Sequence, residues 1–241
     1  MFNRLFVFYA LYTYSHWCSG YPTCPQTCSC YNRYRTMDCR ESGLYTVPEV
    51  NNITSQLYLD DNQIRHLPHE AFFAAPHIYQ ISLQNNFLNT LDTRTFRGLT
   101  SLHQLDLSGN WISFIRNDMT SPSRADNLTT INLAYNKLEE IPSGMPHFAP
   151  HLRSLNMAYN VISSAHFDKN YTTLSVLEEI DLSGNILTEV LSQHLEALRN
   201  TSLATLNLIS CGIVSIDDEV FSGFNYLKHL YLSGNNIPDG F

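Results

Sequence analysis

The chain has 241 residues, of which 44% are hydrophobic and 15% charged, and its formal net charge is −8. This composition is typical of globular proteins and excludes the disordered and fibrous classes. The negative charge argues against nucleic acid as a partner, because phosphates are bound by clustered basic side chains and the sequence has no basic stripe.

Residues 1–20 predict a secretory signal peptide. Arg4 precedes an aromatic and aliphatic run at 5–12, and polar and small residues follow. The run is too short to cross about 30 Å of hydrocarbon, which takes roughly 20 apolar residues. Cleavage after Gly20 would leave small residues, Cys18 and Gly20, at the −3 and −1 positions. A signal anchor is the alternative, and the polar residues after the run disfavour it.

Four of the six cysteines lie close together, at Cys24, Cys28, Cys30 and Cys39. The spacing of Cys28 and Cys30 is too tight for a C-x-x-C zinc knuckle, and the cluster follows a signal peptide, so we expect two disulfides. Cys18 would leave with the signal peptide, and Cys211 then remains alone. Taken by itself, Cys211 is open to interpretation as a nucleophile, a metal ligand or half of a disulfide.

Sequons for N-glycosylation occur four times, at Asn52, Asn127, Asn170 and Asn200. Any one match could arise by chance, since the N-x-[ST] pattern is short. Together with the signal peptide and the cysteines, they indicate a glycosylated extracellular protein.

From Leu57 onward, the pattern L-x-L-x-x-N-x-L recurs eight times. We call its asparagine position the slot, and the slots are Asn62, Asn86, Asn110, Asn136, Asn160, Asn185, Cys211 and Asn235. Successive slots are 24 to 26 residues apart, and an Ile or Leu follows two residues after each. This periodicity is that of the leucine-rich repeat. The register places Cys211 in a buried row of turn-stabilising amides, so we expect a buried and inert thiol there.

The repeat predicts an α/β solenoid, bent into a horseshoe, with a parallel sheet on its concave face. Each x-L-x-L segment forms a short strand whose leucines point inward, and stacked repeats bury a continuous core. Eight strands at about 4.8 Å spacing give a ladder of roughly 40 Å. Irregular turns and short helices should fill the outer face, and 191–200 is a candidate helix with three leucines on one side.

Residues 24–241 resemble the extracellular leucine-rich-repeat proteins of the 24-residue class. The segment "CPQTCSCYNRYRTMDC", followed by "GLYTVP", is similar to the cysteine-rich cap that precedes the repeats in Slit-type guidance proteins, chaoptin-like adhesion proteins, Toll-like receptors and small leucine-rich proteoglycans. The resemblance implies the pairs Cys24–Cys30 and Cys28–Cys39. With the signal peptide at 1–20, the expected organisation has three parts, the other two being a cap at 21–52 and eight repeats at 53–241, the last incomplete.

The family's C-terminal cysteine-rich cap is missing, so the last strand should lack cover on one side. We expect a fragment of a longer protein, and the alternative is that a partner caps this end. The leucines concerned are Leu227, Leu230 and Leu232. No later segment is apolar enough to span a bilayer, so a membrane anchor is expected only beyond residue 241.

Residues that flank the inward leucines should point to the concave face, because side chains alternate along a strand. This surface is polar and carries acids without matching bases, which favours a basic or polar partner, with two tyrosines as candidate anchors. The candidate ligand-binding residues are Tyr58, Asp60, Gln80, Gln84, Gln104, Asp106, Glu179, Asp181, His229 and Tyr231. None of the sequons lies at a concave position, so glycans should leave this face open. A solvated face with the partner bound elsewhere is the alternative.

Catalysis is not expected. The histidine pairs in "RHLPH" and "PHFAPH" are interrupted by prolines, so neither makes a helical metal clamp, and no nucleophile elbow or carboxylate pair stands out. Tyr135 and Tyr159 occupy equal places in neighbouring repeats and are expected to stack. We predict no enzyme activity, cofactor or metal.

The sequence therefore predicts an extracellular recognition module, secreted or at the cell surface. The favoured function is that of a receptor or adhesion ectodomain whose concave face binds a protein ligand. The alternative is a secreted matrix protein that binds a matrix protein or a glycan.

Overall fold

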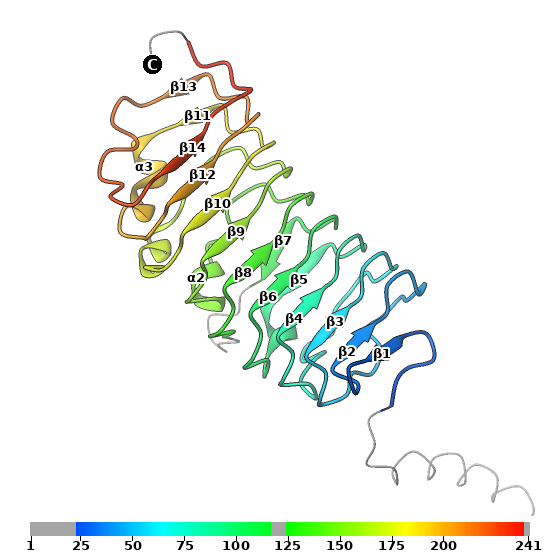
Figure 1. Ribbon diagram of the computed structural model, residues 1–241. Helices are drawn as coiled ribbons and strands as arrows, with labels where there is room; N and C mark the ends of the chain where they lie inside the picture. The colour runs from blue at the N-terminus through cyan, green and yellow to red at the C-terminus, as the bar shows by residue number, and fades with distance from the viewer. Residues whose placement is uncertain (1–22, 117–123, 239–241) are drawn as a thin grey trace, which may run out of the picture.

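A computed structural model describes residues 23–116 and 124–238, so the predicted signal peptide lies outside the described residues. The described chain forms one elongated, curved solenoid in which successive repeats lie side by side (Figure 1). We number the repeats by their slots, from repeat 1 at Asn62 to repeat 8 at Asn235. Within the described ranges, no helix is long and apolar enough to cross a membrane.

A ten-stranded sheet runs the length of the solenoid. Its strands, in spatial order, are β1 (Ser29–Tyr31), β2 (Thr36–Asp38), β3 (Gln56–Tyr58), β4 (Gln80–Ser82), β6 (Gln104–Asp106), β8 (Thr130–Asn132), β9 (Ser154–Asn156), β10 (Glu179–Asp181), β12 (Thr205–Asn207) and β14 (His229–Tyr231). Only β1 is antiparallel to its neighbour. The eight predicted strands are all present, and the cap adds the first two.

The opposite, convex side is irregular. Two short parallel pairs lie there: β5 (Thr90–Asp92) with β7 (Phe114–Arg116), and β11 (Glu189–Val190) with β13 (Ser215–Ile216). Single helical turns complete it: η1 (Thr93–Phe96), α2 (Met145–Phe148), η2 (Lys169–Thr173), α3 (Ser192–Leu195) and η3 (Glu196–Leu198). The helix predicted at 191–200 is therefore wrong in length, since α3 and η3 are two short turns that bury Leu195 and Leu198.

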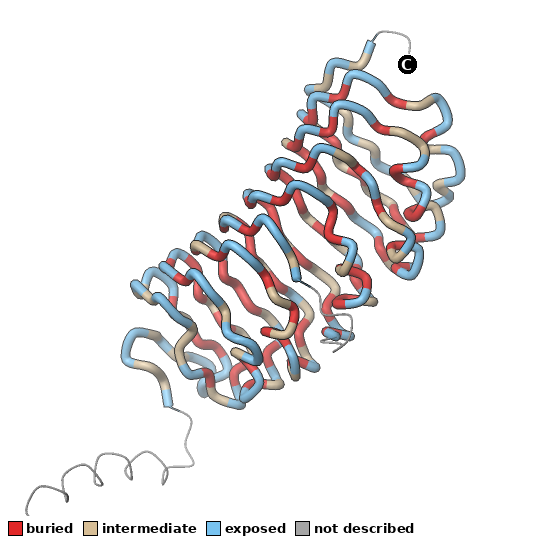
Figure 2. Tube along the Cα trace, turned by 180° about the vertical axis from the view of Figure 1, so that it is seen from behind, coloured by how far each residue is buried: buried red, intermediate tan, exposed pale blue. Residues whose placement is uncertain are grey.

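The core lies between these two sides and is continuous along the solenoid (Figure 2). The inward residues of the sheet are almost fully buried from Leu57 in repeat 1 to Leu206 in repeat 7. Burial of one such side chain contributes about 1.5–3 kcal/mol. On the convex side, three aromatic rings pack in a row. The ring centroids of Phe72 and Phe96 are 5.9 Å apart, and those of Phe96 and Phe148 are 5.7 Å apart. Each repeat thus covers the apolar face of its neighbour.

The slot asparagines connect successive repeats by hydrogen bonds. Asn136 is 3% exposed, and its Nδ2 donates to the carbonyls of Leu107 and Leu133, both at 3.0 Å. Its Oδ1 accepts from the N–H of Ile112 at 2.9 Å. The amide satisfies buried backbone groups of two repeats at the point where the chain turns away from the strand.

Cys211 occupies the slot of repeat 7 and is fully buried. Its Sγ contacts the Leu182 carbonyl at 3.2 Å, the position that an amide nitrogen takes in other repeats. A thiol has no counterpart to the amide oxygen, and the N–H of Leu187 instead donates to the backbone carbonyl of Cys211 at 3.0 Å. The backbone thus replaces the missing side-chain acceptor.

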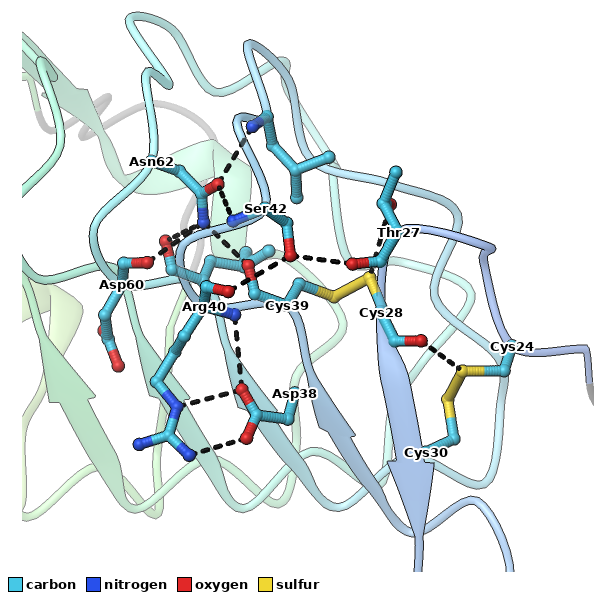
Figure 3. Close-up of a disulfide and its surroundings, with 12 residues drawn as sticks. Cys24, Thr27, Cys28, Cys30, Asp38, Cys39, Arg40, Ser42, Asp60 and Asn62 are labelled. Atoms are coloured by element: carbon cyan, nitrogen blue, oxygen red, sulfur yellow. Dashed lines mark hydrogen bonds and ion pairs between the residues drawn. A yellow bond between two sulfur atoms is a disulfide. The ribbon is translucent and has the colours of Figure 1, made fainter.

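The cap closes the N-terminal edge of the sheet (Figure 3). It contains the disulfides Cys24–Cys30 and Cys28–Cys39, the same pairs that the resemblance implies. Asn62 fastens the cap to the solenoid: its Oδ1 accepts from two cap N–H groups and its Nδ2 donates to the Cys39 carbonyl at 2.8 Å. Without such a cap, the strand edge and core of the first repeat would face water.

At the other end, β14 is the last strand described. Leu227, Leu230 and Leu232 are half-buried there, whereas their counterparts in repeat 7 are buried. These leucines pack against the core on one side only.

Candidate functional site

The concave surface presents three rows of side chains, which we name by their order along each strand. The first row is Gln56, Gln80, Gln104, Thr130, Ser154, Glu179, Thr205 and His229. The second row is Tyr58, Ser82, Asp106, Asn132, Asn156, Asp181, Asn207 and Tyr231. The third row follows each strand by two residues and is Asp60, Gln84, Ser108, Ala134, Ala158, Ser183, Ile209 and Ser233.

The two acidic residues of the second row, Asp106 and Asp181, make hydrogen bonds that stabilise the fold. Asp106 Oδ1 accepts from the N–H of Ser108 at 2.9 Å, and its Oδ2 accepts from Asn132 Nδ2 at 3.1 Å. Asp181 repeats this arrangement, with Ser183 N–H at 2.8 Å and Asn207 Nδ2 at 3.0 Å. Both carboxylates thus fix the end of their strand and join a neighbouring repeat. Each side chain is half-buried and remains partly open to the concave surface.

Asp60, predicted as a ligand-binding residue, is instead buried at 8% exposure. Its carboxylate accepts from the hydroxyl of Ser82 and from the N–H of Gln84, at 3.0 Å for the latter. Burial raises the pKa of Asp60, and these two hydrogen bonds oppose the rise. The chain bends inward after the strand, so the third row is mostly buried, and the alternation that holds within the strand fails there.

The remaining candidates face solvent. Gln84, Gln104, Glu179, His229 and Tyr231 are exposed, and Tyr58 and Gln80 are half-buried. At the C-terminal end, the rings of His229 and Tyr231 are stacked, with centroids 6.4 Å apart. Tyr231 is 46% exposed, so this pair offers the largest free aromatic surface of the two strand rows. The structure brings the candidates onto one face, with the aromatic ones at its two ends.

At the N-terminal end, the cap contributes residues that the sequence analysis missed. The Arg40 guanidinium lies over the Tyr58 ring, 5.4 Å from its centroid. Asp38 of β2 lies beside Tyr58, just before the second row begins, and its carboxylate accepts from Arg40 Nε at 2.9 Å and Nη2 at 2.6 Å (Figure 3). These hydrogen bonds hold the pKa of Asp38 below its usual value. The sequence feature that could have revealed these residues is the short segment "TMD" directly before Cys39. This segment forms a strand but lacks the leucine pattern of the repeats.

The concave surface is acidic. Its three rows contain four carboxylates and no Lys or Arg. Arg40 lies at the cap end and is paired with Asp38. Charges of one sign on a low-dielectric surface attract an oppositely charged partner and speed its association.

Next to the concave surface, the turns after the strands carry aromatic side chains that we call the aromatic rim: the half-buried Phe87 and the exposed Trp111, Tyr135 and Tyr159. Tyr135 and Tyr159 are stacked as expected, with centroids 4.5 Å apart and planes inclined by 4°. Both residues have a positive φ, at 56° and 53°, which costs a non-glycine residue about 1–2 kcal/mol. Gly184 lies against the other face of Tyr159 and leaves room for the ring.

The four sequons lie away from the concave rows. Asn52, Asn127 and Asn200 are exposed in the segments that lead into β3, β8 and β12. Asn170 lies on the convex side, in η2. Glycans at these positions would surround the concave surface without covering it.

The surroundings of Cys211 do not favour a role as a nucleophile, a metal ligand or half of a disulfide. Burial raises the pKa of its thiol, and no other cysteine of the described chain is free. In the ranges 23–116 and 124–238, no three His, Cys, Asp or Glu side chains are grouped to hold a metal ion.

Comparisons with known proteins agree with this architecture. The family pattern described as "Leucine rich repeat" matches residues 54–112, 126–187 and 201–239. Lumican of Rattus norvegicus is 30% identical over 223 residues, which are 90% of this chain and 62% of lumican. The transforming growth factor beta activator of Danio rerio is 27% identical over 202 residues, 83% of this chain and 26% of that protein. A solved leucine-rich-repeat protein of Leptospira interrogans superposes with a TM-score of 0.69 at 25% identity, over 83% of this chain and 49% of its own.

The chain spans less than two thirds of the length of these relatives. The protein is extracellular, secreted or at the cell surface. With its disulfide-bonded N-terminal cap and eight stacked repeats, the chain belongs to the extracellular leucine-rich-repeat proteins.

Proposed function

We propose that the protein is a receptor or adhesion ectodomain that binds a protein ligand on its concave surface. The observation that carries this proposal is the combination of carboxylates without Lys or Arg in the three rows and aromatic residues at the two ends. Binding energy in protein interfaces is concentrated in a few aromatic and charged anchors. Tyr58 and Tyr231 are the proposed anchors, and Glu179 supplies exposed charge between them.

The proposed ligand is a protein with a basic, convex surface. Glu179 is exposed, and the outer oxygens of Asp106 and Asp181 are shared only with neutral amides. Basic side chains of a partner would pair with these carboxylates without having to displace a cation. The four sequons also leave this approach open.

The test uses a charge and anchor variant of the secreted protein, screened with the wild type against a panel of extracellular proteins. Glu179→Lys combined with Tyr231→Ala should weaken binding of a captured ligand by at least about tenfold, mainly through slower association. The matched control is Glu219→Lys with Tyr226→Ala, which changes an exposed acid and an exposed tyrosine outside the rows. Equal loss in both variants, or none in the first, would refute concave binding.

A secreted matrix protein is the second candidate, and the likeness to lumican over 90% of the chain favours it. An acidic concave surface repels sulfated glycans, so a matrix partner of this face would be a protein or a neutral glycan. An anchor or stop-transfer segment in the full-length transcript would decide for the receptor. Binding of the soluble protein to immobilised matrix proteins, lost in the same concave variant, would decide for the matrix.

A further inference from the structure

The convex side has a gap in its strand pairing. The pairs β5–β7 and β11–β13 flank repeats 4 and 5, which have no convex strand of their own. A groove runs across this gap and consists of two adjoining cavities of about 230 and 910 Å³. Both cavities are lined by Ser113, Phe114, Glu140 and Ser143. The larger one lies within the ~300–1,000 Å³ range of pockets that hold small ligands.

The lining has the chemistry that binds sugars. Phe114 is 53% exposed and offers an apolar ring to the C–H face of a pyranose. Glu139 and Glu140 are exposed, form no ion pair within the described chain and can accept hydrogen bonds from hydroxyl groups. Serine hydroxyls at Ser113, Ser143, Ser163 and Ser164 serve as both donors and acceptors.

His194 adds a buried donor to the wall of the larger cavity. Its side chain is nine-tenths buried, and its Nδ1 accepts from the N–H of Leu191 at 3.2 Å. The ring therefore carries its proton on Nε2, which has no hydrogen-bond partner among the described residues. Burial lowers the pKa of His194, which keeps this ring neutral. A neutral N–H at a cavity wall suits a hydroxyl or carbonyl oxygen.

Asn170, the convex sequon, lines the smaller cavity. Its position is fixed by Tyr171, which is fully buried and donates its hydroxyl to the Pro142 carbonyl at 2.9 Å. Asp168 accepts from the backbone N–H of Asn170 at 2.7 Å and from its Nδ2 at 3.4 Å. A glycosylated amide keeps one N–H, so the contact with Asp168 survives modification. The attachment point of a glycan is thus held at the edge of the groove.

We propose that the glycan on Asn170 folds back into this groove and seats its first sugars against Phe114, Glu140 and the neighbouring serines. The inference requires that the Asn170 sequon is used, and it is independent of ligand binding on the concave face. Covalent attachment supplies an effective concentration in the millimolar range, so weak contacts suffice for occupancy. The glycan would cover the apolar ring of Phe114 and complete the convex side where the strand pairing is interrupted.

The test measures how well the glycan is protected in the native protein. The chain is secreted from cells that attach high-mannose glycans, and glycopeptide mass spectrometry follows each sequon during digestion with an endoglycosidase that cuts between the two core GlcNAc residues. The Asn170 glycan should be trimmed at least about tenfold more slowly than the glycan on exposed Asn200. After denaturation in urea, the two rates should be equal.

Two groove variants test whether the Asn170 glycan is protected by binding in the groove or only by the fold around its attachment site. Phe114→Ala and Glu140→Ala change exposed residues and should each bring the Asn170 rate toward that of Asn200 without altering the Asn200 rate. Trp111→Ala is the matched control, since it removes an exposed aromatic ring outside the groove and should leave the Asn170 rate unchanged. Three results would overturn the proposal: an unmodified Asn170, equal native rates at both sites, or protection that persists in both groove variants.

Discussion

Alanine substitutions at two slots, Asn136 and Cys211, should lower the free energy of unfolding by different amounts. In Asn136→Ala, the carbonyls of Leu107 and Leu133 lose their donor, and the N–H of Ile112 loses its acceptor. Each net hydrogen bond contributes about 1 kcal/mol, so loss of the three shortest bonds lowers the free energy of unfolding by about 3 kcal/mol. The slot is almost fully buried, so water does not replace these bonds.

Cys211→Ala removes much less. Its thiol has one short contact, with the Leu182 carbonyl at 3.2 Å, and a thiol is a weak donor. The N–H of Leu187 keeps its partner, because that partner is the backbone carbonyl of residue 211. We expect a loss of about 1 kcal/mol from the weak bond and the small cavity.

Urea unfolding of the secreted protein, followed by far-UV circular dichroism, measures both losses. Gln84→Ala is the control, because this exposed residue uses only its backbone in the hydrogen bonds described here. The m-value is compared between variants, since stacked repeats can lose cooperativity. If Cys211→Ala costs as much as Asn136→Ala, the backbone compensation inferred at repeat 7 is wrong.

Three further predictions concern single sites. Hydrogen bonds from Arg94 lower the pKa of Asp92 to about 2, whereas the value in an unfolded chain is about 3.9. The Asp92 carboxylate therefore stabilises the fold above pH ~4, and this stabilisation is lost as the pH falls toward 2. Asp92→Asn should therefore reduce the drop in urea midpoint across that interval, and an unchanged drop would contradict the assignment. The Cys211 thiol should react with a thiol reagent on the order of 10²-fold more slowly in the native protein than in urea, and rapid native labelling would refute its burial. Gly184→Ala places a Cβ 2.7 Å from the Tyr159 ring at a φ of +68°, so it should lower stability by about 1–2 kcal/mol; Tyr159→Ala in the same chain should restore part of this loss, as read from thermal unfolding.

The repeat pattern was sufficient to predict the strands and the slot of Cys211, because inward leucines and turn amides recur at fixed offsets. It predicts irregular turns and short helices on the convex side, but not where each of them lies. These are helical turns of three to five residues, as α2 and η2 illustrate, and strands of two or three residues, and they follow from packing between neighbouring repeats rather than from local propensity. The helix expected at 191–200 is accordingly present only as two short helical turns, α3 and η3.

The candidate site was predicted less completely. Alternation along a strand correctly places Glu179 and Tyr231 on the concave surface, but it stops where the strand ends, and so it misplaces Asp60. Arg40 was missed because the cap strand pairs with β3 without carrying the leucine pattern. The partial use of Asp106 by the fold depends on contacts between repeats, which a single repeat does not reveal.

The strands stay in register although successive slots are 24 to 26 residues apart. All differences in length are therefore absorbed on the convex side, and the concave surface keeps the same spacing along the whole solenoid. For a ligand, this surface is a grid with a constant step of about 4.8 Å between columns. A substitution at one exposed position of this grid changes the side chain presented there and leaves the spacing of the other positions unchanged. Such a surface lets recognition be altered one residue at a time at exposed positions such as Gln104 and Glu179, where the side chain faces solvent.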